Sequence, residues 1–240
     1  MNSTLETILN HRSIRKFKQQ PIDKDILDTI LKAGIAASSS SLLQVVSIIR
    51  VTEKDKRNKL VELSGNQPYV AQAAEFLVFC IDYQRHLEFN PNVKVYYTEL
   101  CLIGAIDAGI MAQNCLVAAE SLELGGVYIG GLRNKAAEVD ELLGLPPHSA
   151  VLFGMCLGYP DQIPEVKPRL PLDVIVHENE YHQLDKKAVA QYDDVMLSYY
   201  AHRSTNQKSS TWSSQVTSKL EGESRPHMLG YLNSKGLFKR

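Results

Sequence analysis

The apolar residues of this chain follow two periods, and the first of them predicts β-strands. Runs rich in Val, Ile, Leu and Phe occupy residues 45–51, 76–81, 127–129 and 150–157. β-branched and aromatic side chains pack well on a pleated surface, and short runs of this kind are typical of strands. We therefore expect a sheet assembled from segments that are far apart in the chain.

Elsewhere the apolar residues recur every three or four positions, which is the spacing of helices with one buried face. The first such helix follows the capping box Ser3-Thr4-Leu5-Glu6, and a second follows Asp23. Other helical patterns lie between the first two strands, before Gly144, and at about 186–202, 212–220 and 226–234. Proline interrupts residues 160–171, and the polar tract 204–214 is expected to be mobile. The pattern predicts one α+β domain, residues 1–240, with a helical and mobile extension over about 160–240.

One predicted helix, from about Tyr96 to Leu124, is apolar around most of its circumference. It is expected to stop at Gly125-Gly126, since paired glycines commonly end helices. A membrane span is one reading, but Asp107 lies near the centre, where an acid costs about 3 kcal/mol in a bilayer. We expect this helix inside a protein core or along a subunit interface.

Composition excludes several classes of function. With 26 basic and 27 acidic residues the net charge is −1, so no global field recruits nucleic acid or an anionic membrane. The N-terminal residues contain no apolar signal segment. The four cysteines lie in apolar segments without CxxC spacing, as expected of small buried residues in a reducing, cytoplasmic compartment: Cys80, Cys101, Cys115 and Cys156.

Several motifs of common enzyme classes are missing. The chain has neither GxGxxG nor a P-loop, and no GxSxG elbow indicates a hydrolase. His177 and His182 resemble a zinc motif, but they are five residues apart and would not share a helix face. We therefore expect no metal site.

A basic cluster follows the first helix, in the sequence His11-Arg12-Ser13-Ile14-Arg15-Lys16-Phe17. Guanidinium groups bind phosphate through paired, charge-assisted hydrogen bonds, so the cluster is a candidate phosphate site. The alternative is a solvated helix end, where cations are stabilised by about 0.3–1 kcal/mol each. The cluster alone does not separate these two readings.

Three further loops carry candidate binding residues. Residues 36–44 contain four consecutive serines, residues 127–133 contain two glycines after a strand, and Lys167-Pro168-Arg169 presents two cations on a stiff loop. Each is also compatible with an ordinary turn or surface loop.

Together these segments resemble a known family. HRSIRKF, ASSSSLLQ, GNQPY, ESLELGGVYIGGLRN and EVKPRLP occur in the order and spacing of the FMN-dependent nitroreductase superfamily, and the similarity runs through HRSTNQKSSTWS and ESRPHMLGYLNSKG. More narrowly, the chain is similar to its NADPH-preferring branch of flavin reductases and oxygen-insensitive nitroreductases. The resemblance implies an α+β nitroreductase-like fold, with a central, mainly antiparallel sheet flanked by helices, in an interwoven homodimer.

The resemblance also implies roles for particular residues. The serine run is expected to reach the flavin from the partner subunit, and Arg15, Lys167 or Arg169 to support its electronics. No side chain is expected to act as nucleophile. The FMN-binding residues implied are His11, Arg12, Ser13, Arg15, Ser39, Ser40, Ser41, Gln67, Tyr69, Tyr128, Ile129, Gly130, Gly131, Lys167 and Arg169. Those implied for NADPH are Arg133, Arg203, Lys208 and Arg225.

The activity implied is NADPH-dependent, two-electron reduction by a ping-pong cycle through FMN. Free FMN, nitroaromatics, quinones and chromate are the candidate acceptors, and flavin reduction is the first choice. One alternative is a nitroreductase, chromate or quinone reductase with flavin reduction as a side activity. Others are a non-catalytic carrier that hands reduced flavin to a luciferase-type partner, and a structural protein without cofactor.

Overall fold

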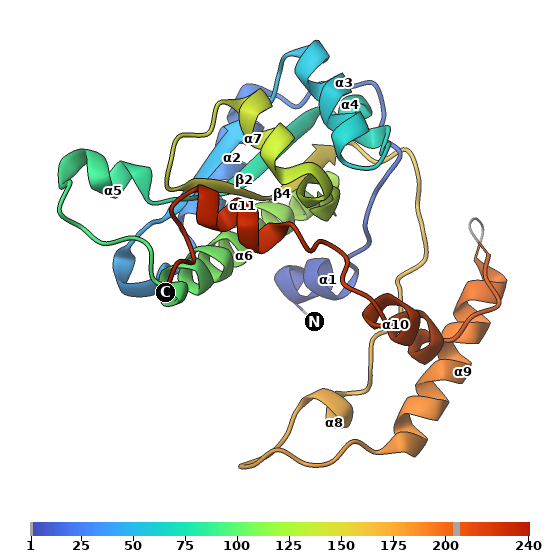
Figure 1. Ribbon diagram of the computed structural model, residues 1–240. Helices are drawn as coiled ribbons and strands as arrows, with labels where there is room; N and C mark the ends of the chain where they lie inside the picture. Colours follow the sequence, from blue (N-terminus) through green and yellow to red (C-terminus); the bar gives the residue numbers. More distant parts are fainter. Residues whose placement is uncertain (1, 204–206) are drawn as a thin grey trace. The chain divides into compact units, whose positions relative to one another are not determined.

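A computed structural model describes residues 2–203 and 207–240. The chain forms two compact units (Figure 1). Unit 1 comprises Met1–Ile163 and Arg225–Arg240, and unit 2 comprises Pro164–Ser224. The chain therefore leaves unit 1 at Ile163 and returns to it at Arg225.

Unit 1 is built on a four-stranded antiparallel sheet with the strand order β1-β2-β4-β3. The strands are β1 (Val46–Arg50), β2 (Glu75–Asp82), β3 (Gly125–Ile129) and β4 (Ser149–Gly158). The predicted α+β class and antiparallel sheet are confirmed, and β1, β2 and β4 lie within one residue of their predicted bounds.

The central strand β2 is buried on both faces. Phe76 and Val78 join one hydrophobic cluster, whereas Leu77 and Phe79 join another on the opposite side. This alternation follows from the two-residue period of a strand. Because both faces are covered, β2 is a nearly continuous apolar run.

Helices supply the two layers that cover the sheet. The cluster with Leu77 and Phe79 includes residues of α2 (Lys24–Ile35) and α6 (Thr98–Ser121). The cluster with Phe76 and Val78 is completed by α3 (Lys54–Leu63), α4 (Tyr69–Gln72), η2 (Gly130–Lys135), α7 (Ala136–Leu143) and α11 (Met228–Ser234). Three short elements complete unit 1: α1 (Ser3–Leu9), η1 (Ser40–Leu42) and α5 (Gln84–Phe89).

Helix α6 has the length and apolar composition that a membrane span requires. In this fold it packs on α2 and on all four strands of the sheet (Figure 1). Its buried side chains, such as Ala112 and Leu116, contribute to the core.

The glycines predicted to stop this helix have a different role. Helix α6 ends at Ser121, and Gly125 and Gly126 open strand β3. A Cβ on Gly126 would lie 2.7 Å from the carbonyl oxygen of Cys156 on the paired strand. The pair is therefore needed for close packing of a strand, and the prediction of a helix stop was wrong.

The first helix also differs from its prediction. Its N-cap is Asn2, whose side chain accepts a hydrogen bond from the Leu5 amide at 3.0 Å, so Ser3 is already inside the helix. An Asn side chain is as good a cap as Ser, and the helix starts one residue earlier as a result.

The C-terminal segment is fastened to the core of unit 1. The Tyr231 hydroxyl accepts a hydrogen bond from the Val151 amide at 3.0 Å, and Lys235 Nζ lies 2.8 Å from Asp140. Beyond them, the carbonyl oxygen of Arg240 accepts from the amide of Thr98.

Unit 2 contains α8 (Leu172–Ile175), α9 (Lys186–His202) and α10 (Trp212–Leu220). Its own small cluster is formed by Tyr192, Met196 and Tyr200, with Trp212 packed against it. Within the predicted mobile tract 204–214, residues 204–206 lie outside the described residues, whereas 212–214 form the first turn of α10. That turn is ordered because Thr211 caps it and the Ser213 amide donates to Asp193 at 2.8 Å.

Candidate functional site

The basic segment after α1 runs as extended chain beside the sheet. The Ile14 amide donates to the Gly126 carbonyl at 2.9 Å, and Phe17 forms a β-bridge with Pro160. Ile14 and Phe17 are buried. Alternation along an extended segment therefore places Ser13 and Arg15 on the opposite side from Ile14.

His11 is tied to the end of helix α6. Its Nδ1 lies 2.6 Å from Oε1 of Glu120, and the side chains are 26% and 11% exposed. The second carboxylate oxygen of Glu120 is buried without a hydrogen-bond partner among the described residues. A nearby carboxylate fixes the orientation of the imidazole and leaves Nε2 for another ligand.

A cavity of about 600 Å³ opens beside this segment. It lies between α1, the end of α6 and the chain after β4. Arg12 lines it together with Glu120, Glu123 and Gln162. The wall therefore carries charges of both signs among apolar residues such as Ile14 and Leu124.

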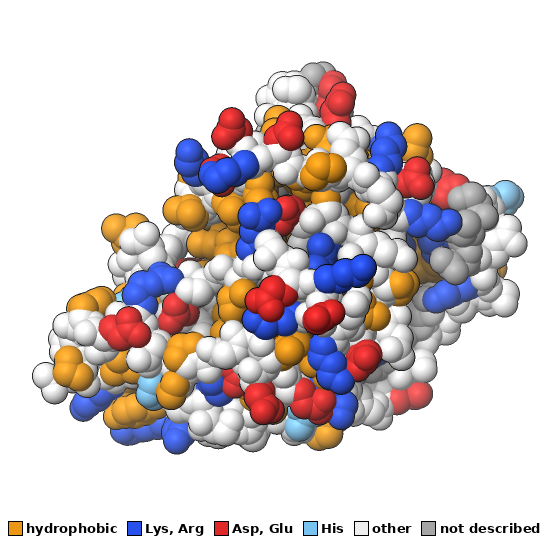
Figure 2. All heavy atoms as spheres, turned by 90° about the horizontal axis from the view of Figure 1, so that it is seen from above, with side chains coloured by type: hydrophobic (Ala, Val, Ile, Leu, Met, Phe, Trp, Pro, Cys, Tyr) orange, Lys and Arg blue, Asp and Glu red, His pale blue; other side chains and the backbone are white. Residues whose placement is uncertain are grey.

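No broad field of one charge marks a site on the face shown in Figure 2, where Lys and Arg alternate with Asp and Glu. This agrees with the net charge of −1. An anionic ligand must therefore be recognised by local donors.

A second group of predicted residues converges at the start of η2. Gln67 Nε2 donates to the Ser64 carbonyl at 2.7 Å, and the Tyr69 hydroxyl donates to Gln67 Oε1 at 2.5 Å. A Cβ on Gly131 would lie 2.2 Å from the same Ser64 oxygen and 2.5 Å from Gln67 Nε2. The GNQPY and YIGG segments, distant in sequence, thus meet where only glycine fits. Gly130, the first residue of η2, precedes this contact.

Tyr128 and Ile129 point to different environments. Tyr128 is 37% exposed, its hydroxyl donates to Gln113 Oε1 at 3.1 Å, and its ring meets Phe153 edge-on. Burial raises the pKa of the Tyr128 hydroxyl, so it remains protonated at neutral pH. The Ile129 side chain is fully buried in the core, which leaves only its backbone for contact with a cofactor.

The serine run is held by Asp107, which is buried in the middle of α6. Ser39 Oγ donates to one carboxylate oxygen at 2.7 Å, and the Ser40 amide donates to the other at 3.2 Å. The next residue, Ser41, has a left-handed φ of 49°. Asp107 was not among the predicted site residues. The signal in the sequence is that Asp107 is the only acidic residue among residues 100–119, in a chain that also contains four consecutive serines.

In unit 2, three predicted cations surround one ring. Lys167 Nζ, Arg203 Cζ and Lys208 Nζ lie 5.7, 5.8 and 5.9 Å from the centroid of Tyr200. Cations are attracted to an aromatic face, whereas like charges that gather around one ring repel one another. The group is therefore suited to an anion. Arg169 lies on the same loop, where its Nη1 donates to the Lys167 carbonyl at 3.5 Å.

Arg133 and Arg225 belong to unit 1. The Arg133 guanidinium donates to the Leu152 carbonyl, and its pKa is lowered by burial and then by Arg225. Arg225 Nε donates to Asn134 Oδ1 at 3.0 Å. The predicted coenzyme residues thus fall into one pair in each unit.

The fold and these groups define a class: an α+β protein with an antiparallel sheet and donors suited to a phosphorylated cofactor. The profile of the "Nitroreductase family" matches residues 8–100 and 102–159, and that of the "Nitroreductase family, C-terminal domain" matches residues 167–240. The chain belongs to the nitroreductase family, which confirms the resemblance found in the sequence.

Full-length relatives agree with this assignment. The chain is 68% identical to an NADPH-flavin oxidoreductase of Vibrio harveyi over 100% of both chains. It is 48% identical to an oxygen-insensitive NADPH nitroreductase of Salmonella typhimurium over 98% of both. The solved structure of the NADPH:FMN oxidoreductase from Vibrio harveyi complexed with NAD+ superposes with a TM-score of 0.95, at 66% identity and 100% coverage of both chains.

The close approach at Gly131 generates a prediction. Gly131→Ala should lower the free energy of unfolding by about 1–3 kcal/mol, because its methyl group would overlap Ser64 and displace Gln67. Urea unfolding measures this. Gly230→Ala is the matched control, since a Cβ there meets no atom within 4 Å in the described chain. Equal stability of the two variants would contradict the predicted contact.

Proposed function

We propose that this chain is an FMN-containing oxidoreductase that uses NADPH to reduce free flavin. The observation that carries the proposal is full-length identity of 68% to an NADPH-flavin oxidoreductase. Predicted ligand residues from distant segments, such as Gln67 and Gly131, also lie together in unit 1.

The donors present fit FMN. His11, Arg12, Ser13 and Arg15 offer imidazole, guanidinium and hydroxyl groups, which suit a phosphate and a ribityl chain. Gln67 and Tyr69 offer an amide and a phenol for the edge of a ring. FMN, when bound, supplies the two-electron redox chemistry. The protein therefore acts by binding, by orientation and by charge.

Charge near the ring is the main electronic contribution of the side chains. A cation at the edge of the flavin where negative charge develops on reduction stabilises the reduced state. Arg15, Lys167 and Arg169 are the candidates for this role. Glu120 has a supporting part, since it orients His11.

The serine residues are proposed to act on the flavin of a partner subunit, in a homodimer. Helix α6 exposes Leu102, Ile106 and Ile110, at 50%, 59% and 40%. Their spacing of four residues makes them one apolar stripe. An exposed stripe on a core helix favours a second copy of the chain as its cover. In this proposal residues 1–240 form one functional domain.

Coenzyme choice is proposed to depend on unit 2. Arg203 and Lys208, beside the Tyr200 ring, would bind the 2′-phosphate that distinguishes NADPH from NADH. Arg225 and Arg133 are proposed as further contacts. Arg133 would contribute charge, since its guanidinium already donates to a backbone carbonyl.

The order of acceptors is proposed from the relatives. The flavin-reductase relative has the higher identity, whereas the second relative is a nitroreductase, so free FMN is proposed first, with nitroaromatics, quinones and chromate after it. Transfer of reduced flavin to a luciferase-type partner is an additional proposal. A cytoplasmic location fits the four free, buried cysteines.

The first test uses the purified protein. It should be yellow, and NADPH should bleach it anaerobically much faster than NADH. Steady NADPH consumption with free FMN and no partner protein is expected, with kcat/KM for FMN above that for nitrofurazone. A colourless protein that binds no FMN and ignores NADPH would refute the proposed function.

The second test concerns coenzyme choice. Arg203→Gln should raise KM for NADPH about tenfold and leave KM for NADH unchanged, because only NADPH carries the phosphate. Steady-state kinetics with each coenzyme measure this. Lys219→Gln, on exposed α10, is the control and should behave as wild type. An equal rise for both coenzymes would argue against phosphate recognition.

The third test concerns the dimer. Ile106→Lys should shift the protein to monomer and release FMN. The reason is that an unpaired charge in an apolar interface costs about 3 kcal/mol or more. Light scattering after size exclusion, with flavin absorbance, reports both effects. Leu229→Lys on α11, with a 55% exposed parent side chain, is the matched control. A monomeric variant that retains FMN would overturn the shared site.

A further inference from the structure

The loop that carries the serine run has an unusual backbone. Ser41, Leu42 and Gln44 have φ values of 49°, 55° and 51°. Residues other than glycine avoid this left-handed region, and such a backbone persists only where surrounding contacts impose it. Something outside the loop must therefore hold its shape.

Packing beneath the loop is incomplete. A cavity of about 240 Å³ lies under it, with Ser39, Gln44, Arg85 and Asp107 in its wall. Leu42 is 75% exposed, so this apolar side chain does not anchor the loop in the described chain. Leu43 packs against the core instead, and the rest of the loop is held by polar contacts.

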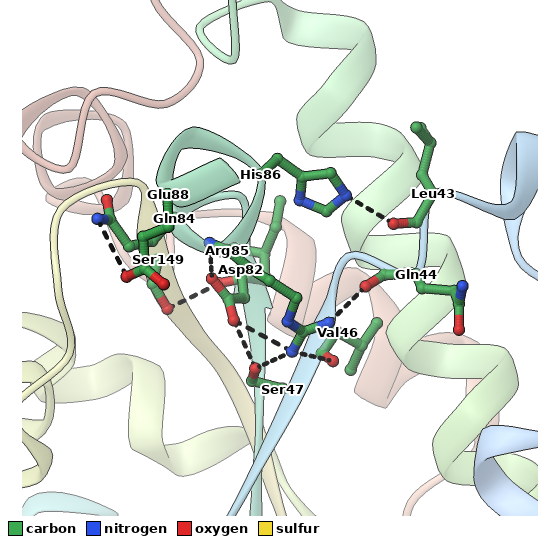
Figure 3. A network of polar contacts seen from close by, with 11 residues as sticks. Leu43, Gln44, Val46, Ser47, Asp82, Gln84, Arg85, His86, Glu88 and Ser149 are labelled. Carbon is green, nitrogen blue, oxygen red and sulfur yellow. Dashed lines mark hydrogen bonds and ion pairs between the residues drawn. The ribbon is translucent and has the colours of Figure 1, made fainter. Parts of the chain in front are cut away.

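Those contacts come from two helices. From α6, Asp107 binds Ser39 and Ser40, and Ser39 Oγ in turn accepts from the Gln44 amide at 2.8 Å. From α5, His86 Nε2 lies 2.8 Å from the Leu43 carbonyl. Figure 3 shows the α5 side of this arrangement.

Arg85 makes the most contacts on that side (Figure 3). Its Nη1 donates to the Gln44 carbonyl at 2.8 Å, and its Nη2 donates to Ser47 Oγ at 2.7 Å and to the Val46 carbonyl at 3.4 Å. Asp82, at the end of β2, pairs with Nη2 at 3.3 Å and accepts from Ser47 Oγ at 2.5 Å. The guanidinium therefore links the end of the loop to the first two residues of β1 and to the end of β2.

The geometry suits arginine in particular. A planar fork can donate to several acceptors at once, whereas an ammonium group is a single point of charge. The carboxylate of Asp82, which is 13% exposed, pairs with the guanidinium of Arg85 and helps to fix its orientation. The carbonyl of Gln44, one of the left-handed residues, is thereby held directly.

We propose that Arg85 is a positioning residue that holds residues 39–44 in the form that presents Ser39, Ser40 and Ser41 to flavin. The inference rests on the proposed function. Arg85 acts through the loop, and its contacts to Gln44, Val46 and Ser47 leave it no part in the redox step. A loop ordered before binding loses less entropy when the ligand arrives, so Arg85 should affect flavin affinity more than turnover.

The chain offers a matched control at the other end of the same strand. Arg50 is 48% exposed and pairs with Glu75 at the start of β2, much as Arg85 is 49% exposed and pairs with Asp82 near its end. Arg50 Nε and Nη2 each donate to Glu75 at 2.7 Å. Removing Arg50 therefore weakens the sheet without touching the serine loop.

The experiment compares Arg85→Gln, Arg85→Lys and Arg50→Gln with wild type, all as holoenzymes. Equilibrium dialysis with flavin fluorescence gives Kd for FMN, thermal unfolding gives stability, and NADPH-driven turnover is measured with FMN added until the site is filled. Arg85→Gln should raise Kd about tenfold and leave kcat unchanged. Arg85→Lys should raise Kd about threefold, since it retains the charge but not the fork. Arg50→Gln should lower Tm without changing Kd.

The outcomes distinguish the positioning role of Arg85 from the proposed function of the whole chain. Unchanged Kd in Arg85→Gln, or an equal rise in Arg50→Gln, overturns the positioning role while wild type remains a flavoprotein. If Arg85→Gln does not fold, Arg85→Lys decides the question in the same way. Failure of wild type to bind FMN refutes the proposed function itself.

Discussion

The pairing of β2 with β4 is the interaction on which the rest of unit 1 depends. Both strands are almost entirely buried, and β2 contributes alternate side chains to the two hydrophobic clusters. Burial of this area, at about 25 cal/mol per Å², is the main stabilising contribution. The polar groups that matter lie where these strands end. Asp82 and Glu75 mark the ends of β2, and each is paired with an arginine. Each end of this buried strand is thus closed by an ion pair.

The strands were predictable because the burial of a strand is visible in its own run of apolar residues. A run such as 76–81 is apolar at every position, since both of its faces are covered. The family could also be predicted, because several short motifs kept their order and spacing along the chain. Gln67 and Gly131 were assigned by that resemblance, and the structure adds the reason for their proximity, which is a contact between Gly131 and the Ser64 carbonyl.

Other features were not predictable, because they arise from long-range contacts. Gly125 and Gly126 have the local appearance of a helix stop, and only the opposite strand shows why side chains are excluded there. Asp107 was noticed as an acid in an apolar helix, but its partners are about 70 residues away in the chain. The contacts of Arg85 with the serine loop could not be predicted either, since its acceptors on Gln44, Val46 and Ser47 lie about 40 residues away in the chain. The return of the chain to unit 1 at Arg225 depends on the same kind of information.

The fastening of residues 225–240 to unit 1 has a consequence for the order of folding during synthesis. This segment is translated after the whole of unit 2, and it contains the partners of three residues of unit 1: Val151, Asp140 and Thr98. Contacts that close such long stretches of chain form slowly, because they must overcome a large loop entropy. Unit 1 therefore stays incomplete on the ribosome while residues 164–224 emerge. During that interval its apolar surface, including the site that Tyr231 later covers, is exposed to chaperones and to neighbouring nascent chains.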